Sequence, residues 1–324
     1  MGSSQLVIGI DGGGTKTACL IADQSGTPLG HGLGGPTNPM FVGVPRARKS
    51  AKQALAVALR EAGYANATFA AACCSGPHSE QIIAEVILRM VEVGAVLTVE
   101  EDEPVRFAAT GGDHGVVVIA GTGSKAFARD RRGRKATAGG WGDRMGDEGS
   151  AGDIAIRAIR AAVRAVDGRA APTALVDSVR EHFRVDNLQE LKPIFYPNGV
   201  PRHELVAFFE DVLAAAKSSD KVARHIFIQA GQELGLAALA VMRALDMLRQ
   251  RVPVVLAGGV ATAAGEWILR PMRHMILREA PHATVISTPC QPVVGDVLLA
   301  LRTAGVAVTQ RLRDRLIAAG GRGS

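Results

Sequence analysis

The stretch that decides the fold is VIGIDGGGTKTACLIAD, residues 7–23. An apolar run ends at Asp11, three consecutive glycines follow, and a second apolar run begins after Lys16. Short apolar runs bounded by glycine are typical of buried strands. The pattern predicts two strands, Gln5–Ile10 and Lys16–Asp23, joined by a turn. Since glycine has no Cβ, the backbone N–H groups of such a turn can approach a phosphate closely.

The same layout returns later in the chain. Residues 115–120 are apolar, residues 121–124 read Gly-Thr-Gly-Ser, and residues 125–130 again look like a strand. A repeated strand, glycine turn and strand indicates an internal duplication. We therefore expect two similarly built domains, each of which opens with a hairpin.

Helical and strand periodicities alternate through the rest of the chain. Residues 192–199 contain proline and asparagine and are expected to form a loop. The first domain should cover residues 1–112 and be completed by a C-terminal helix at 308–320, and the second should cover 113–307. The expected helices are 45–62, 80–93, 151–167, 173–183, 203–216, 220–248, 263–278, 292–303 and 309–318, and the further strands are 28–32, 68–75, 95–99, 135–138, 252–257 and 284–287.

The composition is that of a globular protein. Of the 324 residues, 47% are hydrophobic and 21% are charged, which excludes general disorder. The net charge is +6, but aromatic residues make up only 4%, and too few are available for base stacking, so no nucleic-acid partner is expected. No apolar run reaches the roughly 18–20 residues that span a bilayer, and no signal peptide is visible. These features predict a cytoplasmic protein with no membrane partner.

Two common nucleotide-binding motifs do not fit the first glycine turn. A Walker A loop needs glycine directly before lysine, whereas Thr15 separates Gly14 from Lys16. A dinucleotide fingerprint beginning at Gly12 would need glycine where Thr17 stands. Both motifs also need a helix after the loop, where this sequence predicts a strand. A phosphate-binding β-hairpin remains.

Three glycine turns resemble the phosphate-1, phosphate-2 and adenosine motifs of the actin/hexokinase/Hsp70 ATPase superfamily: Asp11–Thr17, Gly121–Ser124 and Ala257–Gly259. Residues 139–142 (Gly-Gly-Trp-Gly) and 146–150 (Gly-Asp-Glu-Gly-Ser) resemble its N-acetylglucosamine kinase branch, which is grouped with the BadF/BadG/BcrA/BcrD ATPases. The resemblance implies an α/β fold of two actin-like (ribonuclease H-like) domains. Each would hold a mixed five-stranded sheet flanked by helices, with an active-site cleft between the domains.

The resemblance also implies ATP and Mg²⁺. Asp11 would hold the metal, although an aspartate before a turn can also cap its own backbone. The residues expected to bind ATP are Gly13, Gly14, Thr15, Lys16, Thr122 and Gly123 at the phosphates, and Gly258 and Gly259 at the adenosine.

Asp102 is the candidate catalytic base, because it precedes Gly121 by the spacing that the family shows for its catalytic aspartate. It stands in a run of acids, which is usually a solvated loop, and Glu101 is the alternative. Asn38 lies in Pro-Thr-Asn-Pro, which favours a turn without any further role. The residues that the resemblance assigns to the sugar are Asn38, Ser124, Lys125, Gly140, Trp141, Gly142 and Asp147.

The implied function is an ATP-dependent kinase that phosphorylates the 6-hydroxyl of N-acetylglucosamine by direct in-line transfer, acting as a homodimer. Glucosamine and N-acetylmuramate are alternative substrates. A different class is an activator ATPase of a partner enzyme, which would hold an iron–sulfur cluster on cysteines. The four cysteines form no CxxC pair and predict neither a disulfide framework nor a zinc site. A sugar-sensing regulator that has kept only the fold is a third possibility.

Overall fold

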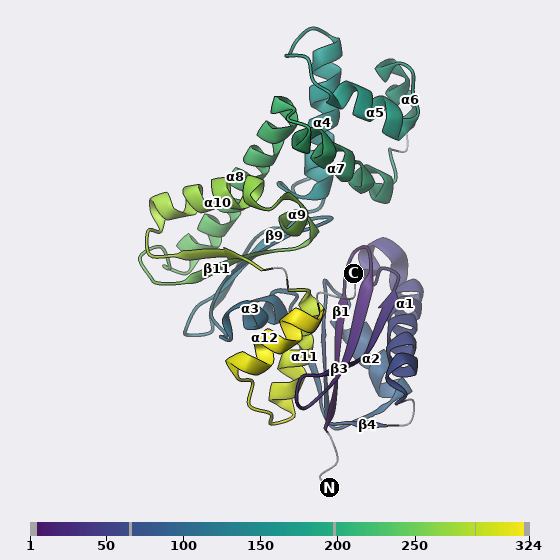
Figure 1. The fold of residues 1–324 in the computed structure, drawn as a ribbon, viewed down its shortest axis with the longest axis vertical. Coiled ribbons are helices and arrows are strands. Elements are labelled where there is room, and N and C mark those ends of the chain that lie inside the picture. Colours follow the sequence, from purple (N-terminus) through teal and green to yellow (C-terminus); the bar gives the residue numbers. More distant parts are fainter. Residues whose placement is uncertain (1–4, 65–66, 197–198, 289, 321–324) are drawn as a thin grey trace. The chain divides into compact units, whose positions relative to one another are not determined.

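A mixed five-stranded sheet lies in each of the two units into which the chain divides (Figure 1). The structure is a computed structural model that describes residues 5–64, 67–196, 199–288 and 290–320. The first unit takes its described residues from Met1–Asp113 and Pro289–Ser324, and the second is His114–Thr288. The α/β class predicted from the sequence is confirmed.

The first sheet has the strand order β3-β2-β1-β5-β7. Its strands are β1 Leu6–Gly12, β2 Thr17–Asp23, β3 Pro28–Gly34, β5 Ala71–Ser75 and β7 Val96–Val99. The first three are antiparallel, and β1, β5 and β7 run parallel. The parallel register aligns Asp11 with Ser75 and Ser75 with Val99, so the carboxyl ends of these strands share one edge. In parallel sheets this edge is where ligands bind.

Helices cover both faces of this sheet. One face packs on α1 (Pro39–Ala62) and α2 (Glu80–Met90), and the other on α3 (Asp102–Thr110), α11 (Pro292–Thr303) and α12 (Gln310–Gly320). Adjacent strand residues alternate between the two cores: Cys73 joins the cluster with α11, and Cys74 joins the cluster with α1 and α2. A strand buried on both faces reads as a continuous apolar run, as 71–74 does. A short parallel pair, β4 (Thr68–Phe69) and β6 (Glu92–Val93), completes the unit.

The second sheet repeats this topology with the order β10-β9-β8-β11-β12. Its strands are β8 Gly115–Ala120, β9 Ser124–Arg129, β10 Lys135–Gly139, β11 Pro253–Ala257 and β12 Thr284–Ser287. Again the first three in sequence are antiparallel, and β8, β11 and β12 are parallel. The duplication that the two glycine turns indicated is therefore present as two equivalent sheets.

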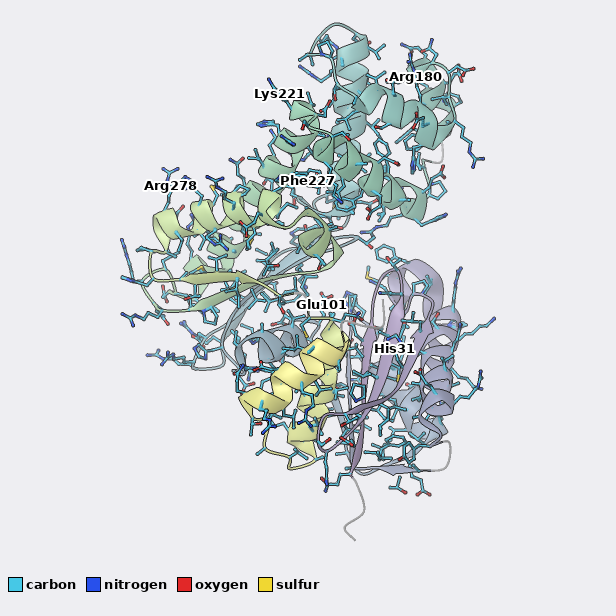
Figure 2. All side chains as sticks on the ribbon, in the orientation of Figure 1. His31, Glu101, Arg180, Lys221, Phe227 and Arg278 are labelled. Atoms are coloured by element: carbon cyan, nitrogen blue, oxygen red, sulfur yellow. The ribbon has the colours of Figure 1, made fainter. Side chains whose placement is uncertain are left out.

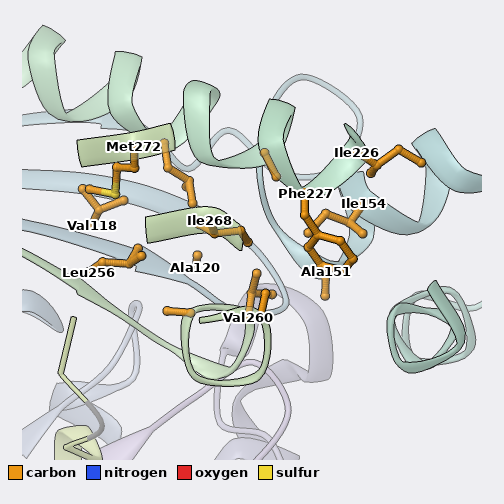
Figure 3. Close-up of a cluster of buried hydrophobic side chains, with 14 of the residues drawn as sticks. Val118, Ala120, Ala151, Ile154, Ile226, Phe227, Leu256, Val260, Ile268 and Met272 are labelled. Atoms are coloured by element: carbon orange, nitrogen blue, oxygen red, sulfur yellow. The ribbon is translucent and has the colours of Figure 1, made fainter. Parts of the chain in front are cut away.

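The second unit is rich in helices, whose apolar faces form one large core (Figure 3). Ile154, Phe227 and Ile268 come from three different helices and belong to this one cluster. Helix α8, which begins at Lys221 in Figure 2, is long and apolar enough to cross a membrane by length and composition, but 56% of its apolar window is buried, as in a core helix. The helices are α4 Ala151–Val166, α5 Leu175–Phe183, α6 Leu191–Phe195, α7 Arg202–Lys217, α8 Lys221–Ala244, α9 Gly259–Ala264 and α10 Glu266–Glu279.

Several elements differ from the sequence prediction. The strand expected at 68–75 is two strands of different sheets, β4 and β5, and β6 replaces the end of the helix expected at 80–93. Helix α3 was not predicted from the sequence, although acids in the first turn and a proline within that turn are favourable at a helix start. The expected loop 192–199 contains most of α6. The helix expected at 263–278 is two helices, because the chain at Gly265 adopts a positive φ of 55°.

Helix α11 lies in the first unit, whereas the sequence places residues up to 307 in the second domain. The cause is a close approach to β1. A Cβ at Gly9 would lie 2.7 Å from Val297 and 2.8 Å from the carbonyl oxygen of Val293, so only glycine lets the helix approach this strand.

Candidate active site

The first glycine turn is a short loop braced by the segment that leads into α1. Gly13 N–H donates to the Lys16 carbonyl at 2.9 Å, and Thr37 N–H donates to the Gly13 carbonyl at 3.1 Å. A Cβ at Gly12 would overlap the Thr37 hydroxyl. Residues 14–16 are exposed, so the tip of the turn is open to a ligand while its base is fixed.

Asn38 lies beside this turn and caps α1. Its Oδ1 accepts from Met40 N–H at 3.0 Å, and the residue is 6% exposed. This is the turn-forming role that the sequence allowed for it. The amide nitrogen and the second lone pair of Oδ1 remain for a contact with a substrate.

Asp11, the second-last residue of β1, lies next to a second carboxylate that the sequence analysis missed. Ser75 Oγ donates to Asp296 Oδ2 at 3.0 Å and lies 3.5 Å from Asp11 Oδ1. Burial raises the pKa of Asp11 to about 6, against the lowering effects of Ser75 and Lys16. Asp296 is fully buried on α11, and burial together with the Asp11 charge raises its pKa well above the usual range. An aspartate inside the otherwise apolar run 292–301 was the available signal.

The residues at this edge fit a magnesium ion that is bound mainly through phosphate. Mg²⁺ favours one or two carboxylates, substrate phosphates and several waters over a cage made only of protein groups. Asp11 supplies a carboxylate beside the first glycine turn. Among the described residues no group of three or more His, Cys, Asp or Glu side chains is placed to hold a metal alone.

Asp102 is the first residue of α3 and is 3% exposed. Its Oδ2 accepts from Nη1 of Arg106, one helical turn later, whereas its buried Oδ1 has no hydrogen-bond partner in the described part of the chain. Burial raises the pKa of Asp102, Arg106 opposes this, and Glu103 and Glu100 add to it. The solvated loop expected for this acidic run is therefore wrong for Asp102.

Two residues separate Asp102 from the end of β7, whose last residue pairs with Ser75, itself the neighbour of Asp11. Asp11 lies near the end of β1 and Asp102 follows the end of β7, so the metal candidate and the base candidate lie at the same edge of one sheet. The alternative base, Glu101, precedes the helix and is labelled in Figure 2.

The second glycine turn is tied to the start of α4. Gly121 N–H donates to the Gly123 carbonyl at 2.9 Å, and Ala151 N–H donates to the Gly121 carbonyl at 2.9 Å. Ser124 Oγ donates to the Glu148 carbonyl at 2.7 Å. The turn therefore lies at a helix N-terminus, where backbone N–H groups and the helix dipole favour an anion.

Asp147 is held against this turn by an arginine that the sequence analysis missed. Arg202 Nη2 donates to Asp147 Oδ2 at 3.1 Å and lies 3.5 Å from the Thr122 carbonyl. Burial raises the pKa of Asp147, and hydrogen bonds from the N–H groups of Ser124 and Gly142 and the charge of Arg202 oppose the rise. Asp147 adopts a positive φ of 63°, which is uncommon outside glycine. The Asp147 carboxylate therefore joins the second glycine turn, through Ser124, to the loop after β10, through Gly142.

Trp141 is 71% exposed in the loop after β10, so its ring is available to a ligand. Lys125 lies beneath the same loop, because a Cβ at Gly140 would be 2.6 Å from its Cδ. The ammonium group of Lys125 is 4.6 Å from the centre of the Phe127 ring. Glycine at position 140, with a φ of 74°, permits this close packing.

The third glycine turn follows β11. Gly258 has a φ of 106°, and a Cβ there would overlap the Ala120 carbonyl oxygen. A Cβ at Gly259, the exposed first residue of α9, would meet nothing within 4 Å. Ala257 pairs with Ile119, so this turn and Gly121–Ser124 end neighbouring strands of the second sheet.

Comparison with known proteins shows the family of this chain. Residues 8–300 match the BadF/BadG/BcrA/BcrD ATPase family. The chain belongs to this family. Membership implies the use of ATP, and the family resemblance inferred from the glycine turns is confirmed.

Individual relatives match over nearly their whole length. An N-acetylmuramic acid/N-acetylglucosamine kinase of Clostridium acetobutylicum is 30% identical, covering 91% of this chain and 97% of the relative. An N-acetyl-D-glucosamine kinase of Dictyostelium discoideum is 25% identical, covering 93% and 99%. A solved structure from Chromobacterium violaceum, provisionally named an N-acetylglucosamine kinase, has a TM-score of 0.71 at 26% identity and covers 93% of this chain and 99% of its own.

Proposed function

We propose that this protein transfers the γ-phosphoryl group of ATP to the 6-hydroxyl of N-acetylglucosamine. The observation that carries the chemistry is Asp102, a buried carboxylate with one oxygen fixed by Arg106 and the other without a hydrogen-bond partner among the described residues. The relatives named as kinases of N-acetylated amino sugars support the substrate class.

Asp102 acts as the general base. Its Oδ1 accepts the proton of the 6-hydroxyl while the sugar oxygen forms a bond to the γ-phosphorus. The bond from that phosphorus to the bridging β-oxygen breaks, and ADP leaves with the electron pair. The raised pKa of Asp102 makes the carboxylate a stronger base than an exposed aspartate would be.

The three glycine turns bind the nucleotide. The exposed residues 14–16 and the turn at 121–124 offer backbone N–H groups to the phosphates, and Lys16 adds a positive charge. The adenosine packs against Gly258 and Gly259. Asp11 holds Mg²⁺, which when bound neutralises charge on the β- and γ-phosphates.

The remaining predicted residues contact or shape the sugar site. Trp141 offers an exposed ring face for stacking against a sugar. Asn38 contributes its amide group and Lys125 its ammonium group. Asp147 shapes the sugar site by holding the loops that contain Ser124 and Gly142. The full set proposed here for the sugar is Asn38, Ser124, Lys125, Gly140, Trp141, Gly142 and Asp147.

The activator class is disfavoured by the cysteines. All four, Cys19, Cys73, Cys74 and Cys290, are buried, and burial raises the pKa of each thiol. Ligation of a shared iron–sulfur cluster needs accessible thiolates. A cytoplasmic location and a homodimer remain predictions of the same proposal.

The proposal is tested by ADP release with a panel of sugars. N-Acetylglucosamine, N-acetylmuramate, glucosamine and glucose are each supplied with ATP and Mg²⁺. We expect the highest kcat/KM with N-acetylglucosamine. A higher value with glucosamine or N-acetylmuramate would reassign the substrate, and sugar-independent ADP release would contradict kinase activity.

A further inference from the structure

Arg106 is a buried cation in helix α3. It lies on α3 and is 2% exposed, and the structure gives its guanidinium one ion-pair partner, Asp102. Its Nε is buried without a hydrogen-bond partner among the described residues. A buried ion pair seldom stabilises a fold more than apolar side chains of similar volume would. The cost of burying this guanidinium therefore calls for a role other than packing.

The geometry of the pair suggests that role. Arg106 is four residues after Asp102, so the two side chains lie on the same face of α3. The contact is made to Oδ2, and within the described ranges Oδ1 has no hydrogen-bond partner. Fixing one oxygen restricts rotation of the carboxylate and thereby fixes the direction of the other.

We propose that Arg106 is the positioning residue of the catalytic carboxylate: it holds Asp102 ionised and turns Oδ1 toward the hydroxyl that loses its proton. The inference rests on the proposed kinase function, because it needs Asp102 to be the base. It adds a residue that the glycine turns and the acidic run give no reason to choose.

The surroundings of Asp102 give the proposal a measurable consequence. Arg106 favours the carboxylate, whereas burial, Glu103 and Glu100 all favour its protonated form. Helix α11 packs on α3, but its charged side chains are engaged elsewhere: Asp296 with Ser75 and Cys73, and Arg302 with Asp113 and the Phe107 ring. Without Arg106, burial, Glu103 and Glu100 remain, and all three raise the pKa of Asp102.

The test is the pH dependence of kcat/KM for N-acetylglucosamine in the wild type, Arg106→Met and Arg106→Lys. Asp102 must be ionised to accept a proton, so activity falls on the acid side as it becomes protonated. Removing an adjacent opposite charge shifts a carboxyl pKa by about 1–3 units. We expect the acid limb of Arg106→Met to move up by about one pH unit or more, and that of Arg106→Lys to lie between.

Arg302→Met is the matched control. It removes the same charge from the same unit, and Arg302 contacts α3 at Phe107, 4.4 Å from the ring centre, instead of at Asp102. Its acid limb should coincide with that of the wild type. An equal shift in this variant would show a general charge effect and overturn the proposal.

An unshifted acid limb in folded Arg106→Met would likewise show that the side chain only fills the core. If Arg106→Met does not fold, Arg106→Lys decides: a fall in kcat of about tenfold or more at unchanged KM supports positioning, and a wild-type kcat contradicts it. A wild type that phosphorylates no sugar would instead refute the proposed function, and this inference with it.

Discussion

Asp102 differs from its acidic neighbours because helix α3 begins there. Its spacing before Gly121 singles out Asp102 in the sequence, but the run of acids at 100–103 favoured a solvated loop at this position. The structure buries the side chain and pairs it with Arg106. Arg106 was not found because the helix that brings the two together was not predicted; once Asp102–Thr110 is helical, the spacing of four residues places them side by side.

Replacing Asp102 by asparagine keeps the shape of the side chain and removes the base. We expect kcat to fall by about 10²–10⁴-fold, the usual contribution of general base catalysis, while the affinity for ATP is kept. Steady-state kinetics and calorimetric titration with a non-hydrolysable ATP analogue measure the two effects. Glu101→Gln is the control, and a larger loss of kcat in that variant would move the base to Glu101.

The role of Arg202 can be tested by removing its contacts with Asp147 and with the Thr122 carbonyl. Arg202→Met leaves Asp147 buried without its cation, which costs about 1–3 kcal/mol of stability, and it releases the contact to the Thr122 carbonyl. We expect a several-fold rise in the KM for ATP together with a lower melting temperature. Arg144→Met, an exposed change in the nearby loop, is the control. Unchanged KM and stability in Arg202→Met would show that the ion pair between Arg202 and Asp147 has no role.

Most elements could be predicted from periodicity and glycine, because strands buried on both faces and amphipathic helices leave plain patterns. The strands at 115–120 and 284–287 occupy the predicted residues. The break at Gly265 was missed because glycine within a helical pattern is usually tolerated. Helix α6 was missed because Pro193 and the sequence after it indicate a loop.

Gly258 and Gly259 form a matched pair for testing the third glycine turn. Gly258→Ala puts a Cβ onto the Ala120 carbonyl at a positive φ and should destabilise the fold by several kcal/mol. Gly259→Ala has open space and should leave the free energy of unfolding nearly unchanged. Urea denaturation of both variants measures the difference. Equal stability of the two would contradict the described backbone at this turn.

Asp220 caps α8 and ties it to the segment before α5. It accepts from Ala223 N–H at 2.8 Å, Ala174 N–H at 2.8 Å and the Thr173 hydroxyl at 2.9 Å. Partial burial alone would raise the pKa of Asp220, but these hydrogen bonds hold it below the ordinary 3.8. Asp220→Ala should cost about 1–2 kcal/mol at neutral pH, measured by urea denaturation.

The pH dependence of this effect has a definite sign. Because the pKa is lowered in the folded state, the carboxylate stabilises the fold above pH 3.8 and loses that contribution as the pH falls below it. Asp220→Asn keeps the cap acceptor and removes the charge, so its stability should lack this acid-range loss. A cost of Asp220→Ala that stays constant through the acid range would contradict the charged cap.

For the molecule as a whole, the duplication seen in two short motifs proved to extend through two sheets of equivalent strand order. The motifs could predict this because each glycine turn needs the strands on either side of it. The place of α11 could not be predicted, because residues 290–303 follow the second sheet in sequence and their contact with Gly9 is set by packing. Asp296, which this helix brings to Asp11, was missed for the same reason.

The central claim is that phosphate moves from ATP to the sugar O6. The most direct measurement is a ¹H–³¹P correlation spectrum of the product formed from N-acetylglucosamine, ATP, Mg²⁺ and the purified protein. The account predicts a phosphomonoester whose phosphorus couples to both H6 protons, formed together with an equal amount of ADP. Coupling to the anomeric proton instead, or free inorganic phosphate with no sugar phosphate, would contradict it.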